Sequence, residues 1–474
     1  MKVLITGANG YIGRRLKRQM LEEPSVAVRL MVRNARSVSL PEGSNLEIVE
    51  GNSFDTDSLD RALEGIDVAY YLIHSMASGE HYRELDRQSA RNFREAAIRQ
   101  GVGRIVYLGG LGVKESASEH LLSRIETGEI LSAKPDQVQC LWFRAGVIIG
   151  SGSASFEIIR NLVQKLPVMI TPEWVRTRAQ PIGVRDVVRY LDAAKELGTK
   201  ESLVIDIGAD ELSYREMMER TAGVMGLKRL LIPVPFFTPG LSSYWLGLFT
   251  PVPVSIARAL IEGLRSEVVR QNRIADDLFA FRPEPFESAV KAAIDEIEQQ
   301  QVISRWSDSG GEVWERDHGK DIADALFVDR RELELGSVTP RSLFAAISCI
   351  GGEQGWFRYS FLWKLRGLAD KLLGGAGLNR GRRCETELRI GDSVDFWKVV
   401  DLKPEKRLLL FAQMKLPGRA WLEFRIEGGR LIQSAYFYPD GLAGRLYWYV
   451  MLPFHCFIFR DMAKTLLERA EEAP

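Results

Sequence analysis

A turn with glycines at positions 7, 10 and 13 restricts the fold of this chain more than any other feature. An apolar run at 3–5 precedes the turn and a helical pattern at 14–20 follows it, so the order is strand, turn, helix. Residues without Cβ let the backbone bend sharply and approach a pyrophosphate, and the helix start offers free N–H groups. This placement predicts a dinucleotide-binding turn, with a glycine turn in another kind of βα unit as the alternative.

Composition limits the class of protein. The 474 residues are too many for one core, so two or three domains are expected. Lys plus Arg and Asp plus Glu each total 63, which leaves no net charge to attract nucleic acid. The four cysteines lie far apart, so we expect neither a metal site nor a disulfide framework, and this usage fits a reducing cytoplasm. Because an apolar strand is expected from residue 3 on, we expect no signal peptide.

Two apolar stretches need comparison with a membrane span. Residues 230–249 carry no charge and are long enough to cross, but Pro233, Pro235 and Pro239 would leave costly backbone groups unpaired in lipid. Residues 446–459 are too short to cross. We expect buried or substrate-facing elements, with weak contact to a membrane surface as the alternative.

Apolar strands alternate with helices in the first part of the chain, which favours an α/β fold with a doubly wound parallel sheet. Further strands are expected at 28–32, 46–49, 68–73, 104–108, 139–144 and 203–207, with helices at 58–63 and 82–100. We divide the chain into a nucleotide-binding domain at 1–228, an apolar and helical lid or substrate-side segment at 229–306, a linker at 307–328 and a last domain at 329–474.

The last domain has a different texture. Strands are expected at 385–390, 396–402, 407–415, 420–426 and 431–438, separated by turn residues, and a closing helix at 445–470 with a possible kink at Pro453. This pattern predicts an antiparallel meander followed by one long helix, an α+β arrangement.

The glycine motif, the strand rhythm and residues 181–187 together resemble the short-chain dehydrogenase/reductase superfamily, especially its extended and atypical, NmrA-like branches. The resemblance implies a Rossmann-like sheet and an NAD(P)-dependent oxidoreductase or epimerase/dehydratase-like protein. It also implies cofactor contacts at Gly7, Asn9, Gly10, Tyr11, Ile12, Gly13, Asn52, Ser53, Leu72, Ile73, His74, Gly109, Gly110, Arg124, Ala145, Gly146 and Val147.

Arg33 follows the second strand, where such proteins read the adenosine ribose. An acidic residue there favours NAD, whereas a basic one pairs with the 2′-phosphate of NADP, so we expect NADP(H). A solvated loop arginine is the alternative reading of Arg33.

The catalytic residues depart from the superfamily pattern of Tyr-x-x-x-Lys with a Ser after the fifth strand. Gly109 stands in the Ser position, and the alignment places His120 for Tyr and Arg124 for Lys. Arg124 can hold ribose hydroxyls but cannot shuttle protons, whereas His120 could act as acid or base. A surface histidine is the alternative for His120, and Ser123 is a lesser catalytic candidate.

The meander and long helix resemble the helix-grip order of START-like (SRPBCC) domains, and the region looks like the uncharacterised bacterial DUF2867 type. In that fold the sheet wraps the closing helix around an apolar cavity, although its many aromatic residues could simply fill the core. The basic loop 379–383 is either a solvated face or a contact for an anionic headgroup or the cofactor domain.

Three functions remain open. The first is an NADP-dependent reductase or epimerase acting on a hydrophobic small molecule, with the cofactor carrying the hard chemistry. The second is a cofactor-binding sensor without turnover, suggested by the missing Ser and Tyr. The third is a protein that binds lipid or another apolar ligand and uses its nucleotide domain structurally.

Overall fold

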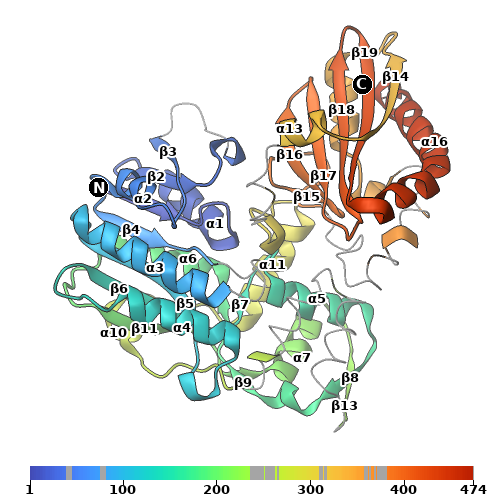
Figure 1. The fold of residues 1–474 in the computed structure, drawn as a ribbon. Coiled ribbons are helices and arrows are strands. Elements are labelled where there is room, and N and C mark those ends of the chain that lie inside the picture. The colour runs from blue at the N-terminus through green and yellow to red at the C-terminus, as the bar shows by residue number, and fades with distance from the viewer. Residues whose placement is uncertain are drawn as a thin grey trace. The chain divides into compact units, whose positions relative to one another are not determined.

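The computed structural model divides into two compact units (Figure 1). One holds residues 1–250 and 254–311, and the other holds 251–253 and 312–474. The residues that the structure describes are 1–38, 45–74, 82–234, 250, 262–263, 266–308, 313, 318–356, 361, 365–367, 370 and 382–472.

The first unit is built on a seven-stranded sheet in which every neighbouring pair is parallel. In spatial order its strands are β11 (Leu203–Ile207), β6 (Gln139–Ala145), β5 (Arg104–Gly110), β4 (Val68–Tyr71), β1 (Lys2–Thr6), β2 (Ala27–Val32) and β3 (Leu46–Glu50). The strand order reverses between β1 and β4, and ligands of such sheets bind beyond the carboxyl ends of the strands at that point. The doubly wound parallel sheet is thereby confirmed.

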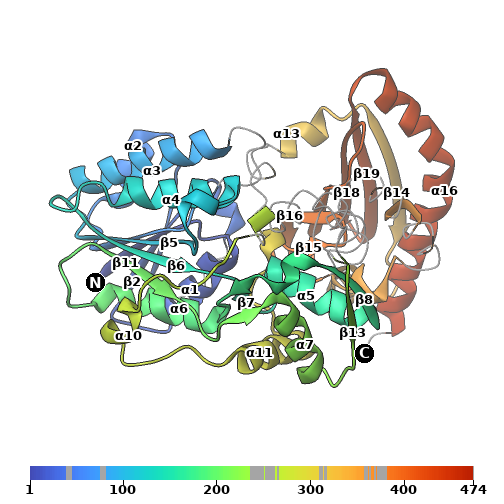
Figure 2. The ribbon, with the colours of Figure 1, turned by 90° about the horizontal axis from the view of Figure 1, so that it is seen from below.

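Alternation along β1 divides the core into two layers. Leu4 packs with α2 (Thr56–Leu63), α3 (Tyr82–Arg99) and α4 (Glu119–Leu131) on one face. Val3 and Ile5 pack with α1 (Tyr11–Leu21), α6 (Val184–Ala193) and α10 (Ile274–Leu278) on the other. Figure 2 shows the sheet between these two groups of helices. A strand that is apolar on both faces is what such a covered parallel sheet requires.

A smaller helical layer extends the first unit. It contains α5 (Ala154–Lys165), α7 (Tyr214–Val224) and α11 (Phe286–Glu298), beside the parallel pair β8 (Val168–Pro172) and β13 (Leu230–Val234). Two short pairs join β7 (Ile148–Ile149) to β10 (Ile182–Gly183) and β9 (Arg178–Ala179) to β12 (Leu212–Ser213). The described part of 229–306 packs into this unit, and a buried Arg15–Glu296 ion pair at 3.1 Å ties α11 to α1.

The second unit is a six-stranded antiparallel sheet. Its order is β14 (Phe327–Glu334), β19 (Arg430–Pro439), β18 (Gly418–Glu427), β17 (Arg407–Ala412), β16 (Trp397–Lys403) and β15 (Ser393–Val394). One face packs on α14 (Pro340–Ser348) and α16 (Gly441–Glu472). α16 continues through Pro453. The short helix α13 (His318–Ala323) and the start of β14 fall where a linker was expected.

Two expectations for this unit are wrong. Residues 385–390 form no strand, because the chain before β15 is an irregular loop held by Asp392, which accepts from Arg389 N at 2.9 Å and from Arg383 Nε at 3.2 Å. The basic loop is not a solvated face where it is described, since Arg382 and Arg383 are buried. Residues 379–381 of that loop lie outside the described residues. β14, which precedes α14 and pairs with the last strand, was not expected.

No helix among the described residues is long and apolar enough to cross a membrane. Residues 235–249 of the first apolar stretch lie outside the described part, and 446–459 lie within α16. Among the described side chains, no group of three or more His, Cys, Asp and Glu could hold a metal ion.

Candidate active site

The glycine turn has the geometry that a dinucleotide pyrophosphate requires. Gly7 has φ of 63°, and a Cβ there would lie 2.3 Å from the Leu72 carbonyl oxygen. A Cβ on Gly13 would lie 2.3 Å from the Gly7 oxygen. Gly10 caps α1 without a side-chain hydrogen bond, and the first turn carries no acidic residue. The N–H groups of the helix start are therefore available to an anion. The residues of this turn thus fit the pyrophosphate of a dinucleotide at the carboxyl edge of the sheet.

Basic side chains lie beside the turn. Arg33 is exposed directly after β2. Arg14 donates from Nε to the Asn9 carbonyl oxygen at 3.1 Å, and the Asn9 amide donates to Ser37 Oγ at 2.7 Å. The loop after β2, which begins with Arg33, is thereby connected to the glycine turn.

The loops after β3 and β4 are fixed by hydrogen bonds. Ser58 Oγ bridges Asn52, contacting its N and O at 3.0 Å each, and Asn92 donates to the Ser53 oxygen at 3.1 Å. β4 ends at Tyr71, so Leu72, Ile73 and His74 follow it as a loop at the carboxyl edge of the sheet.

Steric crowding explains why position 109 is a glycine. A Cβ on Gly109 would lie 2.5 Å from Trp142 Nε1, and one on Gly128 would lie 2.2 Å from Cε2 of the same indole. Trp142 is 6% exposed and its indole N–H is unpartnered. The indole thus occupies the space that a serine side chain would need at the end of β5.

Arg124 lies on α4 at the same strand end. One terminal guanidinium nitrogen donates to the Leu108 carbonyl oxygen at 2.6 Å, while Nε is buried without a hydrogen-bond partner. An unpaired buried donor costs about 1–3 kcal/mol. A ribose hydroxyl oxygen would satisfy it, and this contact stays a prediction for Arg124.

His120 belongs to a chain of hydrogen bonds that sequence reasoning did not foresee. Its Nδ1 lies 3.1 Å from His74 Nε2, and His74 Nδ1 lies 3.0 Å from Asp86 Oδ2. Asp86 is buried and also accepts from Ser123 Oγ at 2.8 Å. A carboxylate only accepts, so His74 donates from Nδ1 and accepts at Nε2. His120 therefore donates from Nδ1 and presents the bare lone pair of Nε2.

Burial sets the charge of this pair. It lowers the pKa of His120 to about 3, helped by the neighbouring His74 and Arg124. It also lowers the pKa of His74, against the opposing effect of Asp86. Both imidazoles are thus neutral near pH 7, and the Nε2 lone pair of His120 can accept a hydrogen bond, whereas taking up a proton works against the low pKa.

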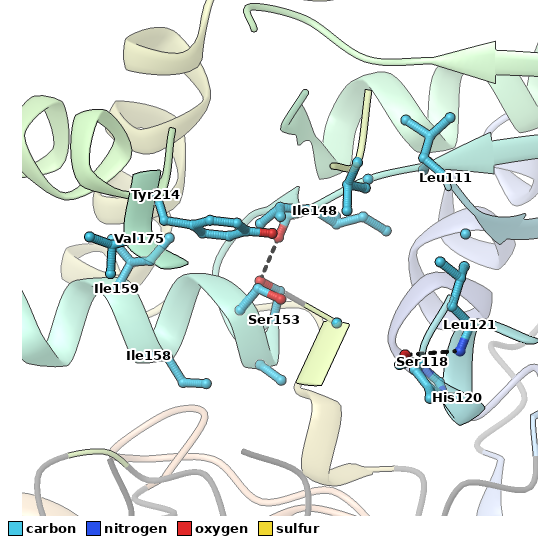
Figure 3. A pocket seen from close by; sticks show the side chains of 18 of the residues that line it. Leu111, Ser118, His120, Leu121, Ile148, Ser153, Ile158, Ile159, Val175 and Tyr214 are labelled. Carbon is cyan, nitrogen blue, oxygen red and sulfur yellow. Dashed lines mark hydrogen bonds between the residues drawn. The ribbon is translucent and has the colours of Figure 1, made fainter. Parts of the chain in front are cut away.

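An apolar cavity of about 470 Å³ adjoins these groups. Leucine, isoleucine, valine and methionine side chains from α5, β8 and α7 make up much of its wall. Figure 3 shows Ser118, His120 and Leu121 on one side and Ile159, Val175 and Tyr214 on the other. His120 is therefore part of a cavity wall rather than a surface histidine, and the Tyr214 hydroxyl is a second polar group facing it.

The cavity brings together part of the expected site. Of the residues named from sequence, Tyr11, Gly109, Gly110, His120, Arg124, Ala145, Gly146 and Val147 line it. Those that do not line it are Gly7, Asn9, Gly10, Ile12, Gly13, Arg33, Asn52, Ser53, Leu72, Ile73 and His74, which belong to the loops after β1 to β4 and to the start of α1. Asp86 and Tyr214 were missed, because no local motif marks either residue.

Family models match both units. Residues 7–141 match a family described as NAD(P)H-binding, and residues 322–462 match a family of unknown function, DUF2867. Together with the sheet order, these matches make the first unit an NAD(P)-binding Rossmann domain of the NmrA-like type. The second unit contains a DUF2867 domain.

Curated relatives are reductases by name. "Ceramide reductase" of Caulobacter vibrioides is 28% identical over 241 residues, 49% of this chain and 73% of that protein. "(4-alkanoyl-5-oxo-2,5-dihydrofuran-3-yl)methyl phosphate reductase" of Streptomyces griseus is 22% identical over 267 residues, 55% of this chain and 85% of that protein. Over about half of its length the chain is thus similar to proteins named as reductases.

Solved structures share the fold. Triphenylmethane reductase of Citrobacter sp., complexed with NADP(H), superposes with a TM-score of 0.50 at 18% identity, covering 61% of this chain and 99% of that chain. At this identity the likeness concerns the fold alone.

Proposed function

We propose that this chain is an NADP(H)-dependent oxidoreductase that interconverts a carbonyl and an alcohol on a small molecule with an apolar chain. The observation that carries the proposal is a half-buried histidine, backed by His74 and Asp86, in the wall of an apolar cavity next to the glycine turn. The nicotinamide, when bound, supplies or takes the hydride. The residues of the chain supply placement and the proton.

His120 is the proton-transfer group in this proposal. In the oxidation direction Nε2 accepts the hydroxyl proton, and the resulting positive charge is shared with His74 and balanced by Asp86. In the reduction direction the protonated pair returns that proton to the carbonyl oxygen. Arg124 holds the ribose with its unpartnered Nε, and Ser123 fixes Asp86.

The names of the relatives support the substrate class. Both denote molecules with a long apolar or alkanoyl group, and the present cavity is lined mainly by aliphatic side chains. We therefore propose a ketone or secondary alcohol flanked by an alkyl chain, with the chain along α5 and a polar substituent near Tyr214.

The test uses the full chain with NADPH and a series of alkyl ketones of increasing chain length. We expect consumption of NADPH whose kcat/KM rises with chain length, and Ile158→Trp, which narrows the cavity, should abolish the preference for long chains. His120→Gln should lower kcat by about 100-fold or more. Glu129→Gln, an exposed site on the same helix, is the matched control. Full turnover by His120→Gln would remove His120 from the mechanism.

The pH dependence of kcat tests the role of His120 independently. Reduction needs the extra proton on the pair, and its pKa lies below neutrality, so kcat for reduction should rise as pH falls from about 8 to about 6. Alcohol oxidation should not show this rise. The difference should disappear in His120→Gln.

Cofactor choice depends on Arg33 in this proposal. Arg33→Asp should weaken NADPH binding about tenfold more than NADH binding, because it removes a partner of the 2′-phosphate and adds a like charge. Arg18→Asp on the exposed side of α1 serves as the charge-matched control. Equal losses for both cofactors would show that Arg33 does not read the 2′-phosphate.

A cofactor-binding sensor is the second candidate, favoured by the loss of the serine position to Trp142. It predicts tight NADPH binding, no turnover with any ketone of the series and a proteolysis pattern that differs between NADP⁺ and NADPH.

We also propose that the C-terminal unit is a helix-grip, START-like domain. Its order of strand, helix, antiparallel strands and long closing helix, with α16 on one face of the sheet, supports this assignment.

A further inference from the structure

Two paired strands of the first unit expose an apolar face. β8 and β13 lie side by side as a parallel pair (Figure 1). Their outward side chains, 42–58% exposed, are two pairs of direct neighbours, Val168 with Leu230 and Ile170 with Ile232. The side chains between them are buried in the helical layer. One face of the pair thus packs on the protein, and the other, here called the β8–β13 face, presents four aliphatic side chains to solvent.

The β8–β13 face lacks the charges that usually protect such a surface. Strands at the edge of a soluble protein commonly carry charged side chains that prevent unwanted contacts. The sequences of β8 (VMITP) and β13 (LLIPV) contain no charged residue. A contiguous exposed apolar patch of this kind is typical of a surface that contacts another molecule.

Prolines argue against a second copy of the chain as that molecule. Pro233 lies within β13, and Pro172 is the last residue of β8. Proline has no N–H to donate and fits poorly in a strand that is paired on both sides. An added strand from another chain is therefore disfavoured, whereas a partner that contacts only the aliphatic side chains is not.

Basic residues lie at one end of the pair. Because the strands are parallel, both begin at the same end. Lys165 comes three residues before β8, and Lys228 and Arg229 directly precede β13. The sequence has no acidic residue at 158–172 or at 220–234. Aliphatic side chains beside a group of cations suit a bilayer that contains anionic lipid, because the side chains enter the acyl boundary while the cations meet the headgroups.

Ile170 connects the β8–β13 face with the cavity that contains His120. It is 52% exposed and is also one of the residues that line this cavity. The cavity therefore reaches the surface at the β8–β13 face. An apolar molecule held in a bilayer against this face has a short route to the cavity that does not cross water.

We propose that the β8–β13 face docks the protein on an anionic lipid bilayer and that the cavity takes up its apolar substrate from that bilayer past Ile170. Docking is independent of the reductase assignment, whereas uptake rests on the proposed function. Leu230 and Ile232 belong to the apolar stretch for which contact with a membrane surface was the alternative expectation.

Docking is tested by photo-cross-linking of the full chain with Ile232→p-benzoylphenylalanine. On vesicles of phosphatidylcholine and phosphatidylglycerol, irradiation should attach phospholipid to the peptide that contains position 232. Val113→p-benzoylphenylalanine, at an exposed apolar site of the same unit, is the matched control and should give about tenfold less adduct. The cross-link reports on one position, so lipid contacts of the second unit do not contribute. Equal adducts at both positions would overturn the docking. A cross-linked dimer without lipid adduct would assign the face to a second copy and overturn it as well.

The cationic end is tested with the same cross-link. Lys165→Gln combined with Lys228→Gln should lower the lipid adduct at position 232 about fivefold, and added salt should lower it in the unchanged chain. Lys200→Gln combined with Lys291→Gln, two exposed lysines of the same unit, is the matched control and should leave it unchanged. Equal adducts on vesicles with and without phosphatidylglycerol would overturn the anionic lipid as the partner.

Uptake is followed with a long-chain ketone that carries a diazirine, by mass spectrometry of labelled α5 peptides. The variant combines Val168→Ser, Leu230→Ser and Ile232→Ser, at positions that do not line the cavity. It should slow labelling from vesicles about fivefold or more and leave labelling by a short, water-soluble ketone probe unchanged. Unchanged labelling from vesicles, or equal slowing with both probes, would overturn uptake at this face.

Failure of this proposal is distinguishable from failure of the proposed function, because neither experiment uses NADPH consumption. Absence of α5 labelling by both probes, in the unchanged chain, would contradict the cavity as a substrate site and with it the uptake. The cross-link at position 232 decides the docking in either case.

Discussion

Gly109 and Trp142 are tied to each other at the end of β5. A Cβ at position 109 would meet the indole Nε1 at 2.5 Å. Gly109→Ser, which would restore the residue expected from the superfamily, should therefore destabilise the first unit by about 1–3 kcal/mol through overpacking. It should lower turnover rather than raise it.

The double variant Gly109→Ser with Trp142→Leu is the control for that prediction. If the clash is the cause, the two changes should not add, and a double-mutant cycle in urea should give a coupling energy of about 1 kcal/mol or more. Additive losses would mean that the indole does not set the residue at 109.

Acid should weaken the first unit through His120. Its folded pKa is about 3, below the unfolded value of about 6.5, so below pH 6.5 the unfolded chain binds more protons than the folded one. Stability is then lost as pH falls from about 6.5 toward 3, by roughly 3 kcal/mol at pH 4. Urea unfolding at several pH values, scored by proteolysis of the first unit, should show a flatter pH dependence in His120→Gln. An unchanged slope would contradict the lowered pKa.

The sequence alone identifies some residues of the candidate site and not others. Gly7 and Gly13 could be recognised because their role depends on local backbone sterics. His120 could be named by its offset from Arg124, four residues later on the same helix. Asp86 could not, because its contacts with His74 and Ser123 join α3 to a loop and to α4, and no spacing along the chain encodes that meeting.

Among the helices and strands, too, some could be predicted from the sequence and others could not. The inner strands of the parallel sheet are buried on both faces, so each appears in the sequence as a mostly apolar run. Residues 385–390 alternate like a strand, yet Asp392 and the two buried arginines Arg382 and Arg383 hold this region as a loop. The hydrogen bonds of these three side chains, which depend on the tertiary fold, therefore outweigh the strand-like alternation of 385–390.

The exposed apolar side chains of α16 are where we expect the weak contact with a membrane surface. Leu446, Tyr449 and Phe457 are 62–66% exposed, and the chain from 441 to 460 has two arginines and no acidic residue. Such a face suits an anionic lipid interface. Replacing these three by serine should reduce co-sedimentation with phosphatidylglycerol vesicles about tenfold without loss of folding. Val113→Ser, an exposed apolar site in the other unit, should have no effect. Equal sedimentation of all three proteins would contradict the contact.

At the scale of the whole molecule, the two units have separate hydrophobic cores, one set around the parallel sheet and one around the antiparallel sheet. The change along the sequence, from strands alternating with helices to successive strands before one long helix, was enough to predict two architectures. The sequence predicted an apolar and helical lid or substrate-side segment at 229–306. It gave no sign that α10 packs in the core of the parallel sheet and α11 in the adjoining helical layer, because their partners lie far back in the chain.

Separate cores predict separate unfolding. NADPH binds the folded first unit alone in our proposal, so at about 100 times its Kd it should stabilise that unit by roughly 2.7 kcal/mol and leave the second unit unchanged. Calorimetry should then show two transitions, of which one moves up by several degrees with NADPH. Hydrogen exchange read by mass spectrometry assigns each transition, with slower exchange expected in β1 and α1 and none of that slowing in β18 or β19. A single transition, or equal shifts of both, would mean that the units fold as one cooperative body.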